Sequence, residues 1–114
     1  MSAQTGSARA AFRAAASCYE SRVRTYVIFF ENVARPTREV IAAHVAHLRA
    51  LDDGGALVVC GPFADGDGGM VCVQAETLDE AAAMAAGDPF VAQGCKRFRV
   101  RELERATRDN GYLG

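Results

Sequence analysis

Hydrophobic and polar residues follow a regular pattern along most of this chain. Four short segments are rich in β-branched and aromatic residues, as is typical of strands: residues 25–31, 56–61, 70–74 and 98–103. Two segments between them have the spacing and composition of helices: residues 38–51 and 78–86. The predicted order is β-α-β-β-α-β, which indicates an α+β domain with the ferredoxin-like fold and a four-stranded antiparallel sheet.

Capping residues mark where the predicted helices begin. Thr37 is a candidate N-cap for the first helix, and Thr77 with Glu80 has the T-x-x-E spacing of a capping box before the second. Asp88 and Pro89 can begin one more helical turn, because Asp is a good N-cap and Pro is tolerated at the first helical position. We therefore expect a short third helix before the last strand.

The first helix carries a predicted buried face that contains a histidine. Four hydrophobic residues recur at helical spacing and define this face: Ile41, Val45, Leu48 and Leu51. His44 lies among them, and His47 lies at the margin of the face. A histidine in such a place is usually a buried side chain bonded to a carbonyl, but it can also point into a cavity. The helical pattern alone leaves both readings open.

Three of the predicted strands are hydrophobic on both faces. A sheet covered by helices on one face and by water on the other should alternate hydrophobic and polar residues. The runs at 27–30, 57–60 and 70–73 do not alternate. A second copy packed sheet on sheet would cover the open face, so we expect a homodimer through the sheet face, in a dimeric α+β barrel. An N-terminal cover is disfavoured because residues 1–22 are too polar.

Composition and charge exclude several classes of partner. The chain has 114 residues, 50% of them hydrophobic, which fits one globular domain. A formal net charge of −1 provides no field to attract nucleic acid, and no hydrophobic run is long enough to span a membrane. The last strand bears a basic stripe, which is common on an edge strand because charge discourages edge pairing: Lys96, Arg97, Arg99 and Arg101. We expect a small molecule as the partner, and neither nucleic acid nor membrane.

We divide the chain into an N-terminal leader, residues 1–23, and a domain over residues 24–114 that ends in a short C-terminal extension. Arg9 and Arg13 interrupt the leader before a signal-peptide core can form. The four cysteines are far apart and form no C-x-x-C motif: Cys18, Cys60, Cys72 and Cys95. We interpret them as reduced thiols, which favours a cytoplasmic location.

Several short motifs between residue 25 and about residue 103 resemble the YciI-like (YCII-related) family. These are H-x-x-H-L-x-x-L at 44–51, Gly-Pro-Phe at 61–63, D-G-x-G-G at 65–69 and D-P-F-V-x-x-G at 88–94. The resemblance implies the dimeric ferredoxin-like fold and, as active-site pair, His44 and Asp88. Family members often carry an Arg shortly before that His. Here Arg38 stands six residues before it, and Ile41 stands three before it.

The chemistry of such a pair is acid–base chemistry, because an imidazole can take up a proton near neutral pH and a carboxylate orients it. The resemblance implies a cofactor-independent lyase or isomerase acting on a small organic substrate; some YciI-like proteins are associated with dehydrochlorination of chlorinated hydroxyquinols. Further candidates for substrate binding are His47, Pro62, Phe63, Phe90 and Arg38. We expect no metal, because a third ligand beside His44 and His47 is not evident.

A non-catalytic function is the alternative. Related domains also occur fused to other proteins, including sigma factors, so the domain can instead bind a small molecule as an accessory or regulatory unit. In that reading Asp88 is only the N-cap of the turn that begins at Pro89. A cavity that contains His44 and Asp88 within hydrogen-bond distance would favour the catalytic reading.

Overall fold

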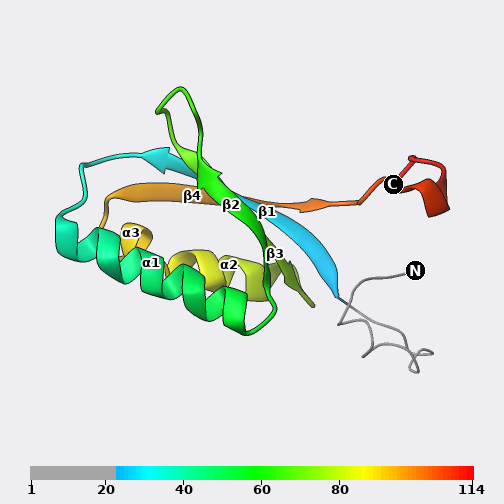
Figure 1. Cartoon of the computed structure of the whole chain (residues 1–114), viewed down its shortest axis with the longest axis horizontal. Helices are drawn as coiled ribbons and strands as arrows, with labels where there is room; N and C mark the ends of the chain where they lie inside the picture. Colours follow the sequence, from blue (N-terminus) through cyan, green and yellow to red (C-terminus); the bar gives the residue numbers. More distant parts are fainter. Residues whose placement is uncertain (1–22) are drawn as a thin grey trace. The chain divides into compact units, whose positions relative to one another are not determined.

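One sheet with helices on a single face forms the body of this protein (Figure 1). The computed structural model describes residues 23–114, and Arg24–Leu103 is one compact unit. Its strands are β1 (Arg24–Asn32), β2 (Leu57–Pro62), β3 (Gly69–Ala75) and β4 (Lys96–Leu103). Its helices are α1 (Arg38–Asp53), α2 (Leu78–Ala86) and α3 (Pro89–Ala92). The predicted order of elements is confirmed, including the short third helix.

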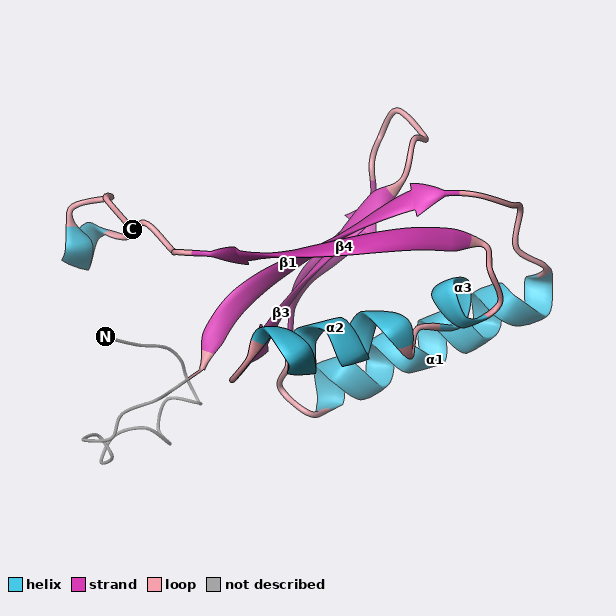
Figure 2. Cartoon of the chain, turned by 180° about the vertical axis from the view of Figure 1, so that it is seen from behind, coloured by secondary structure: helices cyan, strands magenta, loops and turns pink. Residues whose placement is uncertain are grey.

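The strands lie in the order β2-β3-β1-β4, and each neighbouring pair is antiparallel. This is the predicted ferredoxin-like α+β fold, with β2 and β4 at the two edges of the sheet. Figure 2 shows the same sheet from behind, with the helices on one of its faces. All four strands differ from the predicted bounds by one or two residues, and two of these differences involve residues used below. β4 begins at Lys96, and β2 includes Pro62, which pairs with Gly69. Proline is tolerated there because an edge strand has one side on which no neighbour needs its missing N–H.

The hydrophobic core lies between the sheet and the helices. β1 and β3 contribute the central side chains, and Ile28 and Val73 are among the most deeply buried. From α2, Ala81 and Ala85 face this layer. Their small side chains let the helix lie close to the sheet.

The predicted buried face of α1 is partly wrong. Ile41 and Val45 are each 45% exposed, whereas Leu48 and Leu51 pack against the core. The less exposed positions of α1 follow a helical spacing that includes both histidines: Val40, His44, His47, Leu48 and Leu51. The hydrophobic residues of α1 occupy a wider arc of the helix surface than the core covers. The buried face of α1 therefore includes His44 and His47 and leaves out Ile41 and Val45.

Local hydrogen bonds explain where the two long helices begin. The Thr37 hydroxyl accepts from the Val40 N–H at 3.2 Å, and the Thr77 hydroxyl accepts from the Glu80 N–H at 3.1 Å. The Glu80 carboxylate accepts a hydrogen bond from the N–H of Glu76 at 2.8 Å, one residue before the cap. Both predicted N-caps are therefore present, and each satisfies an N–H that the helix itself leaves unpaired.

The loop between β2 and β3 is held against β1. Gly68 has a φ of 81°, and a Cβ at this position would lie 2.3 Å from the carbonyl oxygen of Phe30. Only glycine fits so close an approach with that backbone conformation. The side chain of Asn32 also donates to the carbonyl of Gly66 at 3.4 Å. The loop is thus brought next to the end of β1, where a hollow described below begins.

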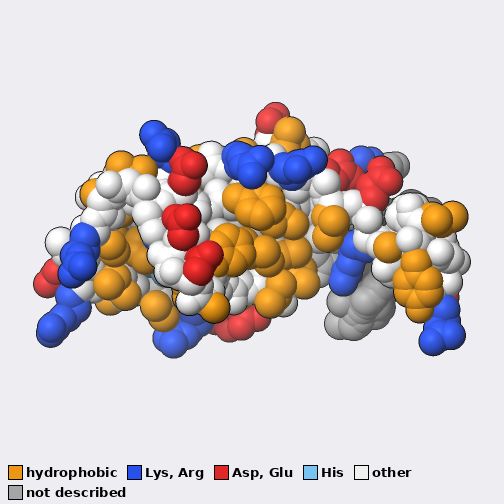
Figure 3. Space-filling view, turned by 90° about the horizontal axis from the view of Figure 1, so that it is seen from above, with side chains coloured by type: hydrophobic (Ala, Val, Ile, Leu, Met, Phe, Trp, Pro, Cys, Tyr) orange, Lys and Arg blue, Asp and Glu red, His pale blue; other side chains and the backbone are white. Residues whose placement is uncertain are grey.

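The sheet face that points away from the helices is hydrophobic at its centre, as Figure 3 shows. The alternation along the paired strands places Val27, Phe29, Met70 and Val59 on this face, and Val59 is 54% exposed. The helix-facing side of the same strands is the core. The prediction that the strands are hydrophobic on both faces is therefore correct.

Outside the main unit, Glu104–Gly114 contains one turn of 3-10 helix, η3 (Arg108–Asn110), where a short helix was expected. Cys72 and Cys95 are buried and Cys60 is half-buried, and no disulfide joins these three residues. No helix in residues 23–114 is long and apolar enough to cross a membrane. The predicted leader, residues 1–23, and Cys18 lie outside the described residues except for Val23, and the cytoplasmic location stays a prediction.

Candidate active site

Asp88 is a buried carboxylate at the start of α3. It is 1% exposed and directly follows Gly87, the C-cap of α2. Its Oδ1 accepts the backbone N–H of Phe90 at 2.9 Å, which makes Asp88 the N-cap of α3. A buried charge must be compensated by more than one cap bond. The rest of the compensation comes from α1.

His44 supplies it. Its Nδ1 lies 2.8 Å from Oδ1 and 3.0 Å from Oδ2 of Asp88. We assign the proton to Nδ1, because an ionised carboxylate can only accept hydrogen bonds. Asp88 thus caps α3 and pairs with His44 at the same time. The lone pair of a neutral His44 is then on Nε2, for which no hydrogen-bond partner is found among residues 23–114.

Phe90 fixes the plane of the imidazole. The rings of His44 and Phe90 stack with centroids 3.8 Å apart and an angle of 16° between their planes. The His44 side chain keeps 15% of its surface exposed, while that of Asp88 keeps 2%. The imidazole is therefore held at two places, at Nδ1 by the carboxylate and on its face by Phe90. Nε2 is the ring nitrogen that neither neighbour occupies, and neither of the two hollows described below is lined by His44 or Asp88.

His47 has a different kind of partner. Its Nε2 lies 3.0 Å from the carbonyl oxygen of Met84, near the end of α2. A carbonyl only accepts hydrogen bonds, so Nε2 carries the proton and donates. This bond ties α1 to α2, and the substrate-binding role expected for His47 stays a prediction.

The remaining candidates are not brought to the pair. Phe63 lines a separate hollow of about 330 Å³ together with Phe29, Phe30, Glu31, Arg97, Phe98 and Arg99. Pro62 ends β2, and Arg38 is the exposed first residue of α1. Of the candidates drawn from the sequence, the structure thus brings together His44, Asp88 and Phe90.

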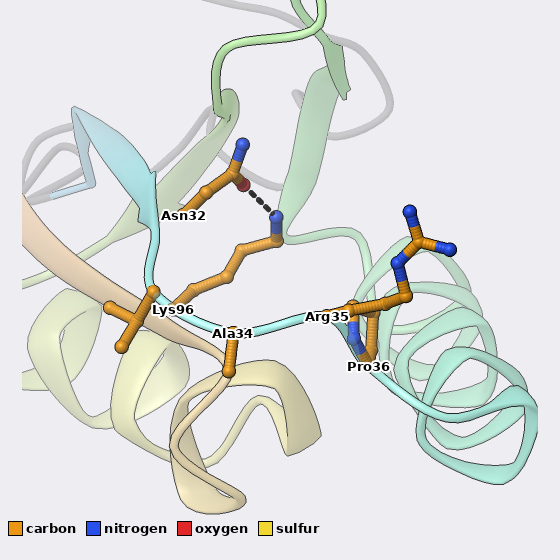
Figure 4. A pocket seen from close by; sticks show the side chains of 6 residues that line it. Asn32, Ala34, Arg35, Pro36 and Lys96 are labelled. Carbon is orange, nitrogen blue, oxygen red and sulfur yellow. Dashed lines mark hydrogen bonds between the residues drawn. The ribbon is translucent and has the colours of Figure 1, made fainter.

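A second hollow, of about 350 Å³, lies where β1 leads toward α1 (Figure 4). It is lined by residues 32–36 and by Lys96, the first residue of β4. The ammonium nitrogen of Lys96 lies 5.0 Å from the centroid of the Phe90 ring, the ring on which His44 stacks. Sequence reasoning placed Lys96 only in a basic stripe and did not single out Asn32 or Arg35. The sequence offered one signal for Lys96: it comes two residues after the D-P-F-V-x-x-G motif, which ends at Gly94. A residue so close to that motif can lie near Phe90.

No set of three His, Cys, Asp or Glu side chains within residues 23–114 is arranged to hold a metal ion. His44 and His47 in particular have separate partners, a carboxylate and a carbonyl.

Comparisons with known proteins identify the family and agree with the fold. The family model for the YCII-related domain matches residues 10–104. The uncharacterized protein YjpA of Bacillus subtilis (strain 168) is 32% identical over 78 residues, which cover 68% of this chain and 92% of YjpA. A solved structure with a TM-score of 0.58 and 25% identity covers 75% of this chain and 98% of its own. It is 5-chloro-2-hydroxyhydroquinone dehydrochlorinase from Burkholderia phenoliruptrix AC1100, in complex with 2,5-dihydroxybenzoquinone. The chain described here belongs to the YCII-related domain family.

Proposed function

We propose that this protein is a cofactor-independent lyase or isomerase, of the dehydrochlorinase type, in which His44 is the general base and Asp88 orients it. The observation that carries the proposal is the bond between His44 Nδ1 and the buried Asp88 carboxylate, which leaves Nε2 as the proton acceptor. The likeness to a dehydrochlorinase supports a reaction of this class. General acid–base catalysis by a positioned side chain typically contributes about 10²- to 10⁴-fold to the rate.

A dehydrochlorination can be written with this pair alone. In the keto tautomer of 5-chloro-2-hydroxyhydroquinone, the chlorine is bonded to a saturated ring carbon beside the new carbonyl. His44 Nε2 takes the proton of the hydroxyl para to that carbonyl, and a second carbonyl forms. The electron pair moves through the ring double bond and expels chloride, which leaves 2-hydroxy-1,4-benzoquinone. The proton and the chloride account for the HCl lost, so the step consumes no external oxidant or reductant.

Asp88 has two tasks in this proposal. Before the reaction it keeps the proton on Nδ1, and after proton transfer its negative charge stabilises the imidazolium. Because Asp88 is nearly inaccessible to water, its interaction with the imidazolium is weakly screened. Phe90 limits rotation of the ring, so Nε2 keeps one direction.

The test is turnover of 5-chloro-2-hydroxyhydroquinone by the full chain, followed by chloride release and quinone absorbance under anaerobic conditions. We expect release of one chloride per quinone formed, and a loss of this activity in His44→Asn. A protein that binds 2,5-dihydroxybenzoquinone but releases no chloride from this or related chlorinated hydroxyquinols would instead be the small-molecule-binding accessory domain described above.

We also propose that two copies pair through the hydrophobic outer face of the sheet. The support is the exposed hydrophobic surface over the sheet, with Val59 half exposed in the single chain (Figure 3). In a monomer, Val59→Asp would change an exposed position and cost little. In a dimer the same change buries an unpaired charge and costs several kcal/mol. Sedimentation should therefore show a dimer for the parent chain and a monomer for Val59→Asp, whereas a monomeric parent at micromolar concentration contradicts the pairing.

A further inference from the structure

The hollow of about 330 Å³ that Phe63 lines has largely aromatic walls. Its lining comes from β1, the start of the β2–β3 loop and the first half of β4: Phe29, Phe30, Glu31, Phe63, Arg97, Phe98 and Arg99. Four of the five phenylalanines within residues 23–114 belong to this lining. Aromatic rings attract one another in stacked and edge-to-face contacts, so the Phe63 hollow favours a flat aromatic ligand.

The β2–β3 loop holds the backbone of Phe63 in place. Figure 1 shows this loop projecting from the sheet on the side opposite the helices. The N–H of Phe63 donates to the carbonyl of Gly68 at 2.9 Å, and the carbonyl of Phe63 accepts from the N–H of Gly66, also at 2.9 Å. The close approach of Gly68 to Phe30 fixes the loop against β1. One wall of the hollow is thus formed before any ligand arrives, although the Phe63 side chain is 40% exposed.

The lining carries two positive charges and one negative charge. Arg97 and Glu31 compensate each other, because Nε and Nη2 of Arg97 both donate to Oε1 of Glu31, at 3.2 and 2.9 Å. Arg99 has no such partner: within residues 23–114, no carboxylate oxygen lies within 4.0 Å of its guanidinium group. The hollow therefore keeps one uncompensated positive charge, which favours an anionic ligand over a neutral one.

The guanidinium group of Arg99 is positioned by the ring of Phe29. The two residues lie opposite each other in the pairing of β1 with β4, and the centre of the guanidinium lies 5.0 Å from the centroid of the ring. This cation–π contact places the charge beside the aromatic wall. No side-chain hydrogen bond joins Arg99 to an acceptor within residues 23–114. Its N–H donors can therefore bind a carboxylate at two points, as the fork of a guanidinium group does.

We propose that the Phe63 hollow is a binding site for a small aromatic carboxylate, separate from the His44–Asp88 pair. The ring of the ligand lies against Phe29 and Phe63, and its carboxylate is bound by Arg99. Neither His44 nor Asp88 lines this hollow, so the site does not depend on the proposed reaction. The volume of the hollow is near the lower end of the range for small-molecule sites, which suits an acid of one or two rings.

The experiment is a calorimetric titration of the full chain with 2-naphthoate and with 2-naphthamide, which has the same rings and a neutral amide in place of the carboxylate. We expect Arg99→Gln to weaken binding of naphthoate by about 10- to 100-fold, the range of a lost hydrogen bond to a charged group, and to change binding of the amide little.

Two further variants serve as controls. Arg101→Gln removes the same charge from the same face of β4, two residues beyond Arg99, and Arg101 does not line the hollow. This variant should bind naphthoate within a few-fold of the parent chain. Phe63→Ala removes a ring contact and no charge, so it should weaken both ligands by a similar factor, about 2- to 10-fold.

Several results would overturn this inference. If Arg101→Gln weakened naphthoate as much as Arg99→Gln does, the basic stripe of β4 would attract anions without a defined site. Equal weakening of both ligands by Arg99→Gln would indicate a structural effect, and an unchanged affinity for naphthoate would remove Arg99 from the site. Failure of the parent chain to bind naphthoate would remove the site itself. A protein that binds naphthoate through Arg99 but releases no chloride would keep the inference and contradict only the proposed reaction.

Discussion

Each half of α1 contains one histidine, and the two histidines have different hydrogen-bond partners. In the first half, His44 faces α3 and bonds to the buried carboxylate of Asp88 through Nδ1. In the second half, His47 faces α2 and bonds to the backbone carbonyl of Met84 through Nε2. Both histidines are half-buried on the packing face, one turn apart. Their sequence contexts are alike, so the difference lies in the partner that the fold provides.

The partner decides which chemistry is open to each ring. A carboxylate holds the proton on Nδ1 of His44 and can stabilise a positive charge on the ring. A carbonyl oxygen carries only a partial charge, so it accepts the Nε2–H of His47 and orients the ring without supplying a full negative charge. Burial of Asp88 increases the contrast, because its charge is shielded from water. In the proposed reaction His44 is therefore the base, whereas His47 ties α1 to α2.

The largest expected effect comes from removing the base while keeping its bond. In His44→Asn, the amide nitrogen can take the place of Nδ1 and donate to Asp88, but nothing replaces Nε2. Turnover should fall by about 10²- to 10⁴-fold, the contribution of a general base. The dissociation constant for 2,5-dihydroxybenzoquinone should stay within a few-fold of that of the parent chain. Chloride release measures the first quantity and calorimetry the second; parental turnover would end the assignment of His44 as the base.

Asp88→Asn should give the next largest loss of turnover. Its side-chain oxygen can still cap α3 by accepting the Phe90 N–H. Its NH₂ group, however, would donate to Nδ1 and move the imidazole proton to Nε2, which removes the lone pair that the reaction needs. Single-turnover chloride release should fall at least about 100-fold while thermal unfolding changes little. An active Asp88→Asn would reduce Asp88 to a helix cap.

A stability measurement on Asp88→Ala separates the helix-cap role of Asp88 from the role of its charge. This variant loses both the cap and the pair, so its unfolding free energy should fall by about 1 kcal/mol for the cap alone. For a domain of this size, 1 kcal/mol lowers the Tm by about 4–8 °C. Differential scanning calorimetry of Asp88→Asn and Asp88→Ala side by side separates the cap from the charge. Equal Tm values would show that the Oδ1 bond to Phe90 contributes nothing.

The elements of this fold could be predicted from the sequence because their signals are local. Thr37, Thr77 and Asp88 act as N-caps through bonds to residues two or three positions away. The face of α1 was less certain, because its hydrophobic residues span a wide arc and only the packing decides which of them are buried. Ile41 and Val45 looked like core and are half exposed.

The site was predictable only in part, for the same reason. His44 and Asp88 could be named from motifs that resemble a family, yet their bond joins residues 44 positions apart and no local pattern contains it. The partner of His47 is a backbone carbonyl, which has no sequence signature at all. Lys96 and Asn32 meet because β1 and β4 are paired in register, a fact that only the sheet topology provides.

The smallest effect on turnover is expected at His47, and it completes the comparison. His47→Gln places an amide nitrogen near the position of Nε2, so the bond to Met84 can persist and the Tm should change by a few degrees at most. His47→Ala loses that bond and its packing, and its unfolding free energy should fall by about 1–3 kcal/mol because the Met84 carbonyl loses its side-chain donor. Turnover per folded molecule should be parental in both variants, since neither changes Nε2 of His44. Denaturant unfolding and chloride release on the same samples test this. A loss of turnover in His47→Gln without a loss of stability would place both histidines in the reaction, and the division of α1 into a chemical half and a structural half would be wrong.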